Sequence, residues 1–230
     1  MDQHIVNFFI HYVIHGRDIP ATSVPPHLTT RSLRNISSRG YNDSDTDHTL
    51  FILDNNLYQL ICRVRALHFR ERNEPTPSST TICRAVELWS ELDNWTFNGD
   101  LTFLDYHTLH ELLVSALFLW IHLMIHSNKL GSDKTQDLVA EGLEKIAEFD
   151  GSPQLCAILL VPLFLHGVAS VERGNRGVVD AQFSRLEERV DDEDETLRSC
   201  RAIVHWTWRR YDSHVTCSWD WADWVEEDLL

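Results

Sequence analysis

The sequence predicts an all-α fold, a single helical domain of about eight or nine helices around a buried central helix. Apolar residues recur at the three-to-four spacing of amphipathic helices along most of the 230 residues, and no segment shows the alternation of a strand. Only 9 Gly and 7 Pro are present, which argues against a turn-rich all-β protein. We expect residues 1–230 to form one domain with a flexible loop at 21–47.

Helices are predicted on both sides of that loop. The first amphipathic helix covers Asp2–His15, and Gly16 ends it. The segment 21–47 is rich in Ser, Thr, Pro and Asp, which is typical of a loop, with one short helix near Ser32–Ser38. A second long helix is predicted over His48–Arg70, where the leucines keep the helical spacing.

The next two predicted helices differ in their apolar pattern. The first covers Thr81–Asn94, is capped by Ser79 or Thr80, and turns one apolar face to the core, namely Ile82, Ala85, Val86, Trp89 and Leu92. The following helix begins at Thr102 and continues to about Lys129. Because its centre is apolar on every side, it is predicted to be the central buried helix.

The two longest apolar stretches are Leu112–Ile125 and Leu155–Val168. Each holds about 14 residues, fewer than the roughly 18–20 that cross a bilayer. Both stretches therefore predict core helices, and we expect no membrane contact. The N-terminus lacks the basic segment and cleavage site of a signal peptide, so we expect a nuclear or cytoplasmic protein that is not secreted.

Start and stop signals define the helices of the C-terminal half. Ser132 is predicted to cap a helix over Asp133–Phe149. The segment Gly151–Pro153 then supplies a stop, a cap and a first-turn proline in consecutive residues. The helix that follows is predicted to be buried and kinked at Pro162.

An amphipathic hairpin is predicted to fold back on this buried helix. A polar turn at Gly174–Gly177 leads into a helix over Gly177–Val190, whose inward side carries Val178, Val179, Phe183 and Leu186. A second helix follows over Glu193–Tyr211. One more helical turn near the C-terminus is predicted from Trp221, Trp224 and Val225.

Composition and motifs argue against several classes of function. The net charge of −15 and the pI near 5.2 disfavour binding to duplex DNA, because such binding neutralises phosphates with Lys and Arg. The sequence contains no P-loop, no dinucleotide-binding glycine motif, no nucleophile elbow and no zinc-protease motif. We therefore predict no catalytic, cofactor-binding or metal-binding residue and no cofactor. The cysteines match no zinc or disulfide spacing, and we expect them to be reduced; they are Cys62, Cys83, Cys156, Cys200 and Cys217.

Four histidines have the spacing of metal ligands on one helix. His122 and His126 stand at i and i+4, and His107 and His110 add a pair a few turns earlier. No Glu lies between His122 and His126, and no third ligand is identifiable. The structural alternative is that these histidines line the core or a groove, each with a hydrogen-bond partner.

Two further positions are candidates for chemistry. His214 and Cys217 also have ligand spacing but stand alone. His166, beside the kinking Pro162, is a candidate general acid or base in a pocket between helices. The alternative for His166 is a structural role in the core.

Four motifs, in the same order along the chain, resemble those of the fungal-specific transcription factor domain, and the last of them spans two segments. Val161–Val190 is similar to the family's Pro-Leu-Phe helix, polar break and Leu-rich helix. Trp206–Asp212 and Asp220–Trp224 resemble its closing pattern of Trp and Asp-Trp. Upstream, Leu53–Phe69 and His107–Ile125 resemble its acidic-start helix and its Ala/Leu-rich central helix.

The resemblance covers most of residues 50–225 and implies a helical regulatory domain. The family's N-terminal zinc cluster, which binds DNA, has no counterpart among the cysteines here, so we expect no direct DNA binding by this chain. We expect a transcription regulator that binds a protein partner or a small hydrophobic effector, with control of a fungal metabolic gene cluster as one role. The alternative is a stand-alone secondary-metabolite pathway protein or enzyme that binds a hydrophobic intermediate on the same scaffold.

Two acidic segments each allow two interpretations. Glu187–Glu195 is either an acidic partner surface or a solvated loop and helix start, where carboxylates favour the helix dipole. Trp219–Leu230 mixes Trp with acids, which is typical of an amphipathic activation segment. The resemblance of its Asp-Trp to the family's terminal Asp-Trp implies instead that this tail docks on the domain.

Overall fold

The computed structural model describes residues 13–14, 55–71, 77–97, 104–189 and 195–227. Every regular element within these residues is a helix and none is a strand, which confirms the predicted all-α fold. The predicted loop at 21–47, the helix near Ser32–Ser38 and most of the first helix lie outside the described residues. Val13 and Ile14, from the end of that first helix, are helical and buried.

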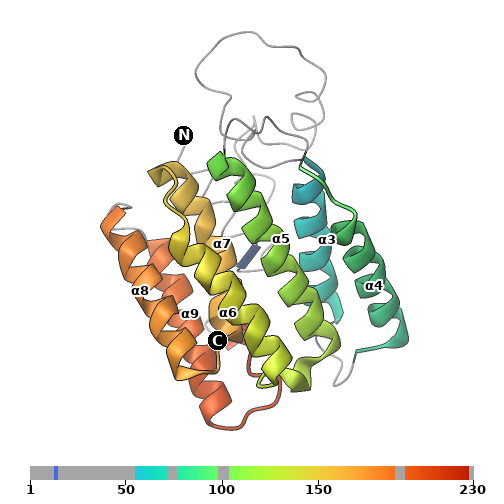
Figure 1. Cartoon of the computed structure of the whole chain (residues 1–230). Helices are drawn as coiled ribbons and strands as arrows, with labels where there is room; N and C mark the ends of the chain where they lie inside the picture. Colours follow the sequence, from blue (N-terminus) through green and yellow to red (C-terminus); the bar gives the residue numbers. More distant parts are fainter. Residues whose placement is uncertain (1–12, 15–54, 72–76, 98–103, 190–194, 228–230) are drawn as a thin grey trace, which may run out of the picture.

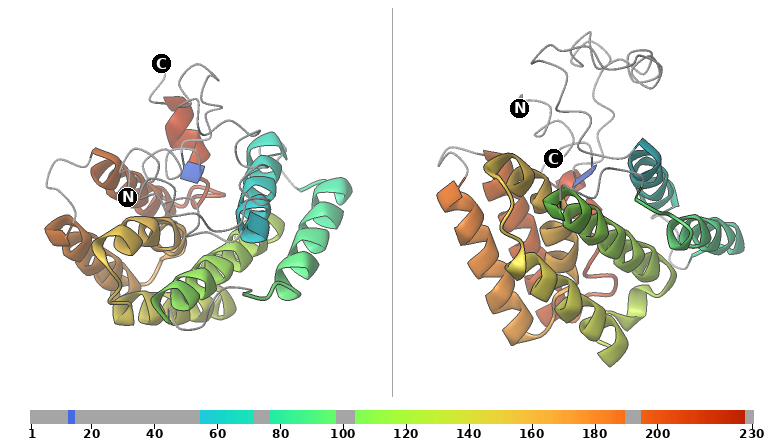
Figure 2. Two further views of the ribbon diagram at one scale, coloured as in Figure 1. Left: turned by 90° about the horizontal axis from the view of Figure 1, so that it is seen from above. Right: turned by 45° about the horizontal axis from the view of Figure 1, so that its top comes forward.

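The described part of the chain contains the following α-helices, of which α3 to α9 pack side by side (Figure 1). They are α3 (Asn55–Glu71), α4 (Ser79–Asp93), α5 (Leu104–Ile125), α6 (Asp133–Glu148), α7 (Pro153–Ala169), α8 (Arg173–Arg189), α9 (Glu195–Asp212) and α10 (Ala222–Glu227). The pair α3 and α4 forms one edge of the bundle, and the pair α8 and α9 forms the opposite edge (Figure 1). The views in Figure 2 show the same order, with α5, α6 and α7 between the two edges.

Two helices share the centre of the bundle. α5 contacts α3, α4, α6 and α7, whereas α7 contacts α5, α6, α8 and α9. All the side chains from Leu155 to Ser170 are buried. A helix without a polar face has to be surrounded by other elements. The predicted central position of α5 is therefore confirmed, and α7 shares it.

α5 is also long and apolar enough, by length and composition, to cross a membrane. In this fold, however, 67% of the most apolar stretch of α5 is buried among the other helices. The core helix of a helical bundle can be equally long and apolar, so length and composition alone do not assign α5 to a membrane.

The starts of α6 and α7 follow local capping chemistry. The N–H of Thr135 donates to Ser132 Oγ at 3.4 Å, which makes Ser132 the cap of α6 as predicted. Ser152 occupies the cap position of α7 and Pro153 its first turn, also as predicted. The Ser152 side chain makes no capping hydrogen bond, so the proline is the stronger start signal there.

Two predicted boundaries are wrong. α4 is capped by Ser78, not by Ser79 or Thr80, because the N–H of Thr81 donates to Ser78 Oγ at 3.1 Å. α5 ends at Ile125 rather than near Lys129. The backbone at His126 leaves the helical region (φ −124°, ψ 47°), and a short 3₁₀ turn, Ser127–Lys129, follows.

The predicted polar turn at Gly174–Gly177 is also wrong, because α8 begins at Arg173 and these residues are its first turns. The guanidinium of Arg176 donates to the carbonyl of Ser170 at 3.3 Å and to both carboxylate oxygens of Asp212 at 2.9 Å. These contacts hold the start of α8 against α9 although glycine disfavours helix. The buried side of α8 consists of Val179, Phe183 and Leu186, while Val178 is 37% exposed.

Candidate functional site

α4 carries apolar residues on two of its faces. The inner face is buried against neighbouring helices and consists of Thr81, Ala85, Leu88 and Leu92. On the outer face, Ile82, Val86 and Trp89 remain 38%, 55% and 37% exposed. The predicted core face of this helix is therefore wrong for these three residues. We refer to Ile82, Val86 and Trp89 as the α4 stripe.

The α4 stripe is continuous along the helix. Its members stand at i, i+4 and i+7, so they follow one side of α4 over about 10 Å. Trp89 extends the stripe toward α5, where its ring centroid lies 4.7 Å from that of the partly buried Phe118. A contiguous apolar patch at a protein surface is a mark of a contact site. The outer side of α4 is thus the strongest candidate for a contact with another molecule.

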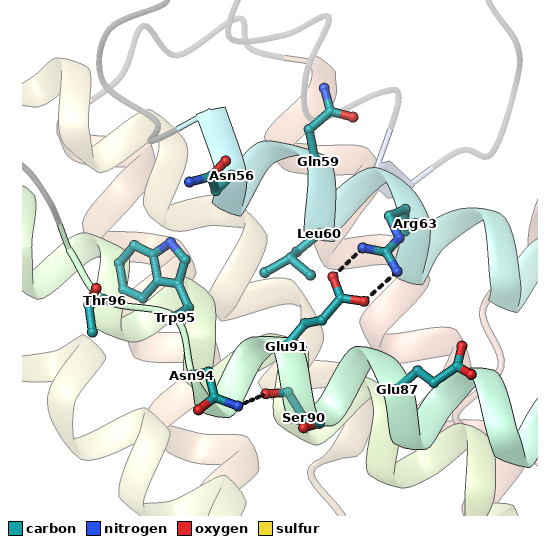
Figure 3. A pocket seen from close by; sticks show the side chains of 10 residues that line it. All are labelled: Asn56, Gln59, Leu60, Arg63, Glu87, Ser90, Glu91, Asn94, Trp95 and Thr96. Carbon is teal, nitrogen blue, oxygen red and sulfur yellow. Dashed lines mark hydrogen bonds and ion pairs between the residues drawn. The ribbon is translucent and has the colours of Figure 1, made fainter.

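A groove of about 680 Å³ runs between α3 and α4 (Figure 3). Leu60 and Trp95 are the apolar residues of its lining; the polar ones are Asn56, Gln59, Arg63, Glu87, Ser90, Glu91, Asn94 and Thr96. Pockets for small molecules are of similar size, roughly 300–1,000 Å³, but are lined mostly by apolar side chains. This lining fits polar or charged groups of a partner better than a small hydrophobic effector.

Charge in the groove is only partly neutralised. Arg63 on α3 reaches across to Glu91 on α4 and donates to both carboxylate oxygens, with an Nη2–Oε1 distance of 2.7 Å (Figure 3). This contact lowers the pKa of Glu91 and raises that of Arg63. Both side chains are about half exposed, so solvent screens the pair. Glu87 and Asp93, on the same helix, form no salt bridge with any described residue.

His166 is enclosed in the core of α7. Its Nδ1 donates to the carbonyl of Pro162 at 2.8 Å, and its Nε2 has no hydrogen-bond partner. A Cβ on Gly142 of α6 would lie only 2.0 Å from that Nε2, so backbone occupies the space that a substrate would need. Burial lowers the pKa of His166 to about 4, which keeps the ring neutral. This geometry favours the structural role over acid–base catalysis.

The predicted histidine pair of α5 is adjacent in space. The rings of His122 and His126 lie 4.9 Å apart between centroids, and His122 Nε2 lies 3.2 Å from Thr135 Oγ1. Burial lowers the pKa of His122, and the neighbouring His126, Lys134 and Lys129 lower it further. Among the described residues, no group of three His, Cys, Asp or Glu side chains is placed to hold a metal ion.

The other two histidines of α5, His107 and His110, have partners of their own. His110 Nδ1 lies 2.6 Å from the carbonyl of Tyr106, and its ring stacks on Trp95 with centroids 5.9 Å apart. His107 Nδ1 faces the carboxylate of Glu111 at 3.7 Å. Each of the two therefore has a local partner on its own helix.

His214 and Cys217 lie in the turns between α9 and α10. Both have left-handed backbone, with φ of 59° and 53°, which is uncommon for residues other than glycine. His214 is exposed, and Cys217 is half-buried with a free thiol. Neither belongs to a metal-binding group among the described residues. The two positions shape the turns that return the chain to the core.

The acidic run Glu187–Glu195 is described only at its ends, since residues 190–194 lie outside the described part. Glu187 accepts hydrogen bonds from Arg201 of α9 at 3.1 Å. Glu195 begins α9, where a carboxylate favours the helix N-terminus. Glu187 thus makes a contact within the domain and Glu195 belongs to the first turn of α9, while the centre of the predicted partner surface lies outside the described residues.

The tail docks on the domain as far as it is described. Trp219 and Trp221 are 3% and 0% exposed, and Trp221 Nε1 donates to the carbonyl of Ile14 at 2.8 Å. The ring of His68 on α3 stacks on Trp219 with centroids 5.2 Å apart, and its Nε2 lies 3.2 Å from Asp220 Oδ1. The docking interpretation is therefore confirmed for Trp219 and Trp221, and the activation-segment interpretation is wrong for them.

The sequence matches the model of a known family. The chain matches the fungal specific transcription factor domain over residues 21–229. The chain belongs to this family. The match confirms the suspected family and supports a transcription-regulator-like role. Neither the comparison with curated proteins nor the comparison with solved structures produced a match.

The sequence-based prediction missed the α4 stripe because it assigned those residues to the core. One signal was present: Leu88, which was left out of the predicted face, completes a second apolar set with Ala85 and Leu92. A helix with two apolar sets turns one of them away from its neighbours when it lies at the edge of a bundle.

Proposed function

We propose that this chain regulates transcription by binding a partner protein and catalyses no reaction. The observation that carries the proposal is the exposed α4 stripe on a domain of a transcription-factor family. Surface aliphatic and aromatic residues in one contiguous line suit a protein contact. The enclosed His166 supports the same choice, because this histidine was the best candidate for catalysis and its Nε2 faces backbone.

The charge of the chain supports partner binding over DNA binding by these residues. A net charge of −15 repels the phosphates of a duplex. We place the protein in the nucleus, where a regulator would meet the transcription machinery, and infer a fungal metabolic gene cluster as its target. Purified protein is expected to show no retention of promoter duplexes in a gel-shift assay at physiological salt. Tight, sequence-dependent binding there would contradict this part of the proposal.

Gene deletion followed by transcript and metabolite profiling tests the regulatory role. The proposal predicts that a set of neighbouring metabolic genes loses expression in the deletion strain. A pathway protein or enzyme on the same scaffold predicts the opposite pattern, in which one intermediate accumulates while the transcripts stay unchanged. That second pattern would remove the regulatory proposal.

A further inference from the structure

We propose that the groove between α3 and α4 binds an extended segment of a partner protein, with a lysine or arginine of that segment beside Glu87. The inference rests on the proposed function and gives the partner a second contact, on another side of α4 from the α4 stripe. It starts from the side chains that line the groove.

Each wall of the groove is one face of a helix. The lining residues stand at i, i+3, i+4 and i+7 on both helices; they are Asn56, Gln59, Leu60 and Arg63 on α3, and Glu87, Ser90, Glu91 and the C-cap Asn94 on α4. Trp95 and Thr96 follow at one end of the groove (Figure 3). Leu60 is buried and Trp95 is half-buried, whereas the other described lining residues are exposed. The walls are therefore open to solvent and mostly polar.

The polarity of the walls selects an extended segment over a helix. A partner helix satisfies its own backbone and docks through apolar side chains, but Leu60 and Trp95 are the only apolar residues of the described lining. An extended segment instead brings unpaired backbone N–H and C=O groups, and a carboxamide both donates and accepts hydrogen bonds. Gln59 on α3 and Asn94 at the end of α4 place carboxamides on both walls. The Nδ2 of Asn94 donates to the carbonyl of Ser90 at 2.7 Å, which holds that carboxamide in place.

The charges in the groove select a basic residue in that segment. Glu87 and Glu91 bring two negative charges to the described lining, and Arg63 brings one positive charge. Arg63 forms its salt bridge with Glu91. Hydrogen bonding to Glu91 raises the pKa of Arg63, and the more distant Glu87 adds to this only through its charge. The groove therefore keeps one negative charge in excess, which a lysine or arginine of the bound segment would neutralise.

Other occupants fit this groove less well. An acidic segment would meet the excess negative charge of the groove and the net charge of −15 of the chain. A second copy of the chain carries the same net charge, so the encounter of two copies is repelled at long range. A hydrophobic effector would leave the polar groups of the walls without partners. The groove is therefore assigned to a basic, extended segment.

A synthetic peptide serves as the probe. It is a fluorescein-labelled segment of about eight residues, with Gly, Ser and Pro around one central Lys, and it extends over roughly 26 Å. Its proline residues keep it out of the helical conformation. Its comparison peptide carries Glu in place of Lys. Fluorescence anisotropy with the full chain is expected to show binding of the Lys peptide, about fivefold or more tighter than the Glu peptide, and a smaller difference as salt rises.

Two matched substitutions separate the groove from general charge attraction. Glu87→Gln and Glu144→Gln each remove one negative charge at an exposed glutamate, in the groove and on α6. Simple attraction to an acidic protein predicts the same small loss of Lys-peptide binding for both variants. The proposal predicts a loss of about threefold or more for Glu87→Gln and unchanged binding for Glu144→Gln. Gln59→Ala should weaken the Lys and Glu peptides by the same factor, because it removes hydrogen bonds to the peptide backbone. Circular dichroism establishes that the variants remain folded.

Three results would overturn the proposal. They are equal binding of the Lys and Glu peptides, equal loss of binding by Glu87→Gln and Glu144→Gln, and unchanged binding of both peptides by Gln59→Ala. Peptide binding does not depend on gene expression. A deletion strain without transcript changes would therefore remove the regulatory function while leaving the assignment of the groove standing. A deletion strain that loses transcripts, beside a chain that binds neither peptide, would remove the assignment of the groove alone.

Discussion

α7 and α4 are both rich in apolar residues, yet the fold treats them differently. α7 lies between α5, α6, α8 and α9, so its described side chains are buried on every side. α4 lies at the edge of the bundle (Figure 1) and contacts α3 and α5 alone among the helix pairs with substantial packing. Its outer apolar row therefore remains exposed. The difference teaches that apolar content alone does not place a residue in the core. The number of neighbouring elements decides it.

The largest expected effect is the loss of stability when a buried aromatic ring of α7 is removed, compared with a partly exposed ring of α4. Phe164 of α7 is 0% exposed and meets Trp221 edge-on, so Phe164→Ala should lower the free energy of unfolding by about 3–5 kcal/mol. Trp89→Ala on α4 should lower it by about 1 kcal/mol or less. Urea unfolding of both variants measures the difference. Equal losses would show that α4 is packed as tightly as α7.

Acidification should weaken the α7 core through His166. Burial holds its pKa at about 4 in the folded state against 6.5 as the ordinary value, so the unfolded chain binds more protons between these pH values. The stabilisation is complete above about pH 6.5 and is lost as the pH falls toward the folded pKa, at up to about 1.4 kcal/mol per pH unit. Urea unfolding at pH 7 and pH 5 should show a smaller decline for His166→Gln than for the wild type. Parallel declines would contradict a neutral buried ring.

A methyl group added to a glycine should destabilise the centre of the fold and stabilise its edge. In Gly142→Ala the new Cβ would meet His166 Nε2 at 2.0 Å, and a loss of about 1–3 kcal/mol is expected. In Gly177→Ala on α8 nothing lies within 4 Å of the new Cβ, so helix propensity should add up to about 1 kcal/mol. Thermal melting compares the two. Gly142→Ala should cost less stability in a His166→Ala background than in the wild type, because the clashing ring is then absent. An equal cost in both backgrounds would place the strain elsewhere.

The smallest expected effect is that of Val86→Asp on stability. Val86 is 55% exposed, so this substitution should change the free energy of unfolding by about 0.5 kcal/mol or less. A thermal midpoint within a few degrees of the wild type is expected. A loss of several kcal/mol would contradict the exposure of Val86 in the folded chain.

Much of the fold was predictable because it depends on local chemistry. Ser132 and Pro153 mark helix starts by their own side chains, and an apolar pattern on all sides marks α5 as buried. The segment Gly174–Gly177 was assigned to a turn because two glycines favour turns. Its helix is held by contacts of Arg176 with Asp212, a residue far along the chain.

The candidate site was less predictable for the same reason. The sequence of α4 offers two apolar faces, one with Leu88 and one with Ile82, Val86 and Trp89. Which of the two faces the core depends on where α3 and α5 lie. His166 of α7 likewise packs against Gly142 of α6, and a contact between two helices leaves no pattern in the sequence of either one. Docking of the tail was anticipated by family resemblance, whereas its partners, His68 and Ile14, were not.

Transcript profiling of a strain with Val86→Asp in the chromosomal gene tests the central claim most directly. The claim is that the exposed apolar row of α4 carries regulation through a partner, while the buried core carries stability. The account predicts that Val86→Asp reproduces the transcript loss of the deletion strain at unchanged protein level, and that Val178→Asp leaves transcripts at wild-type values. Wild-type transcripts in the Val86→Asp strain, beside a clear loss in the deletion strain, would contradict it.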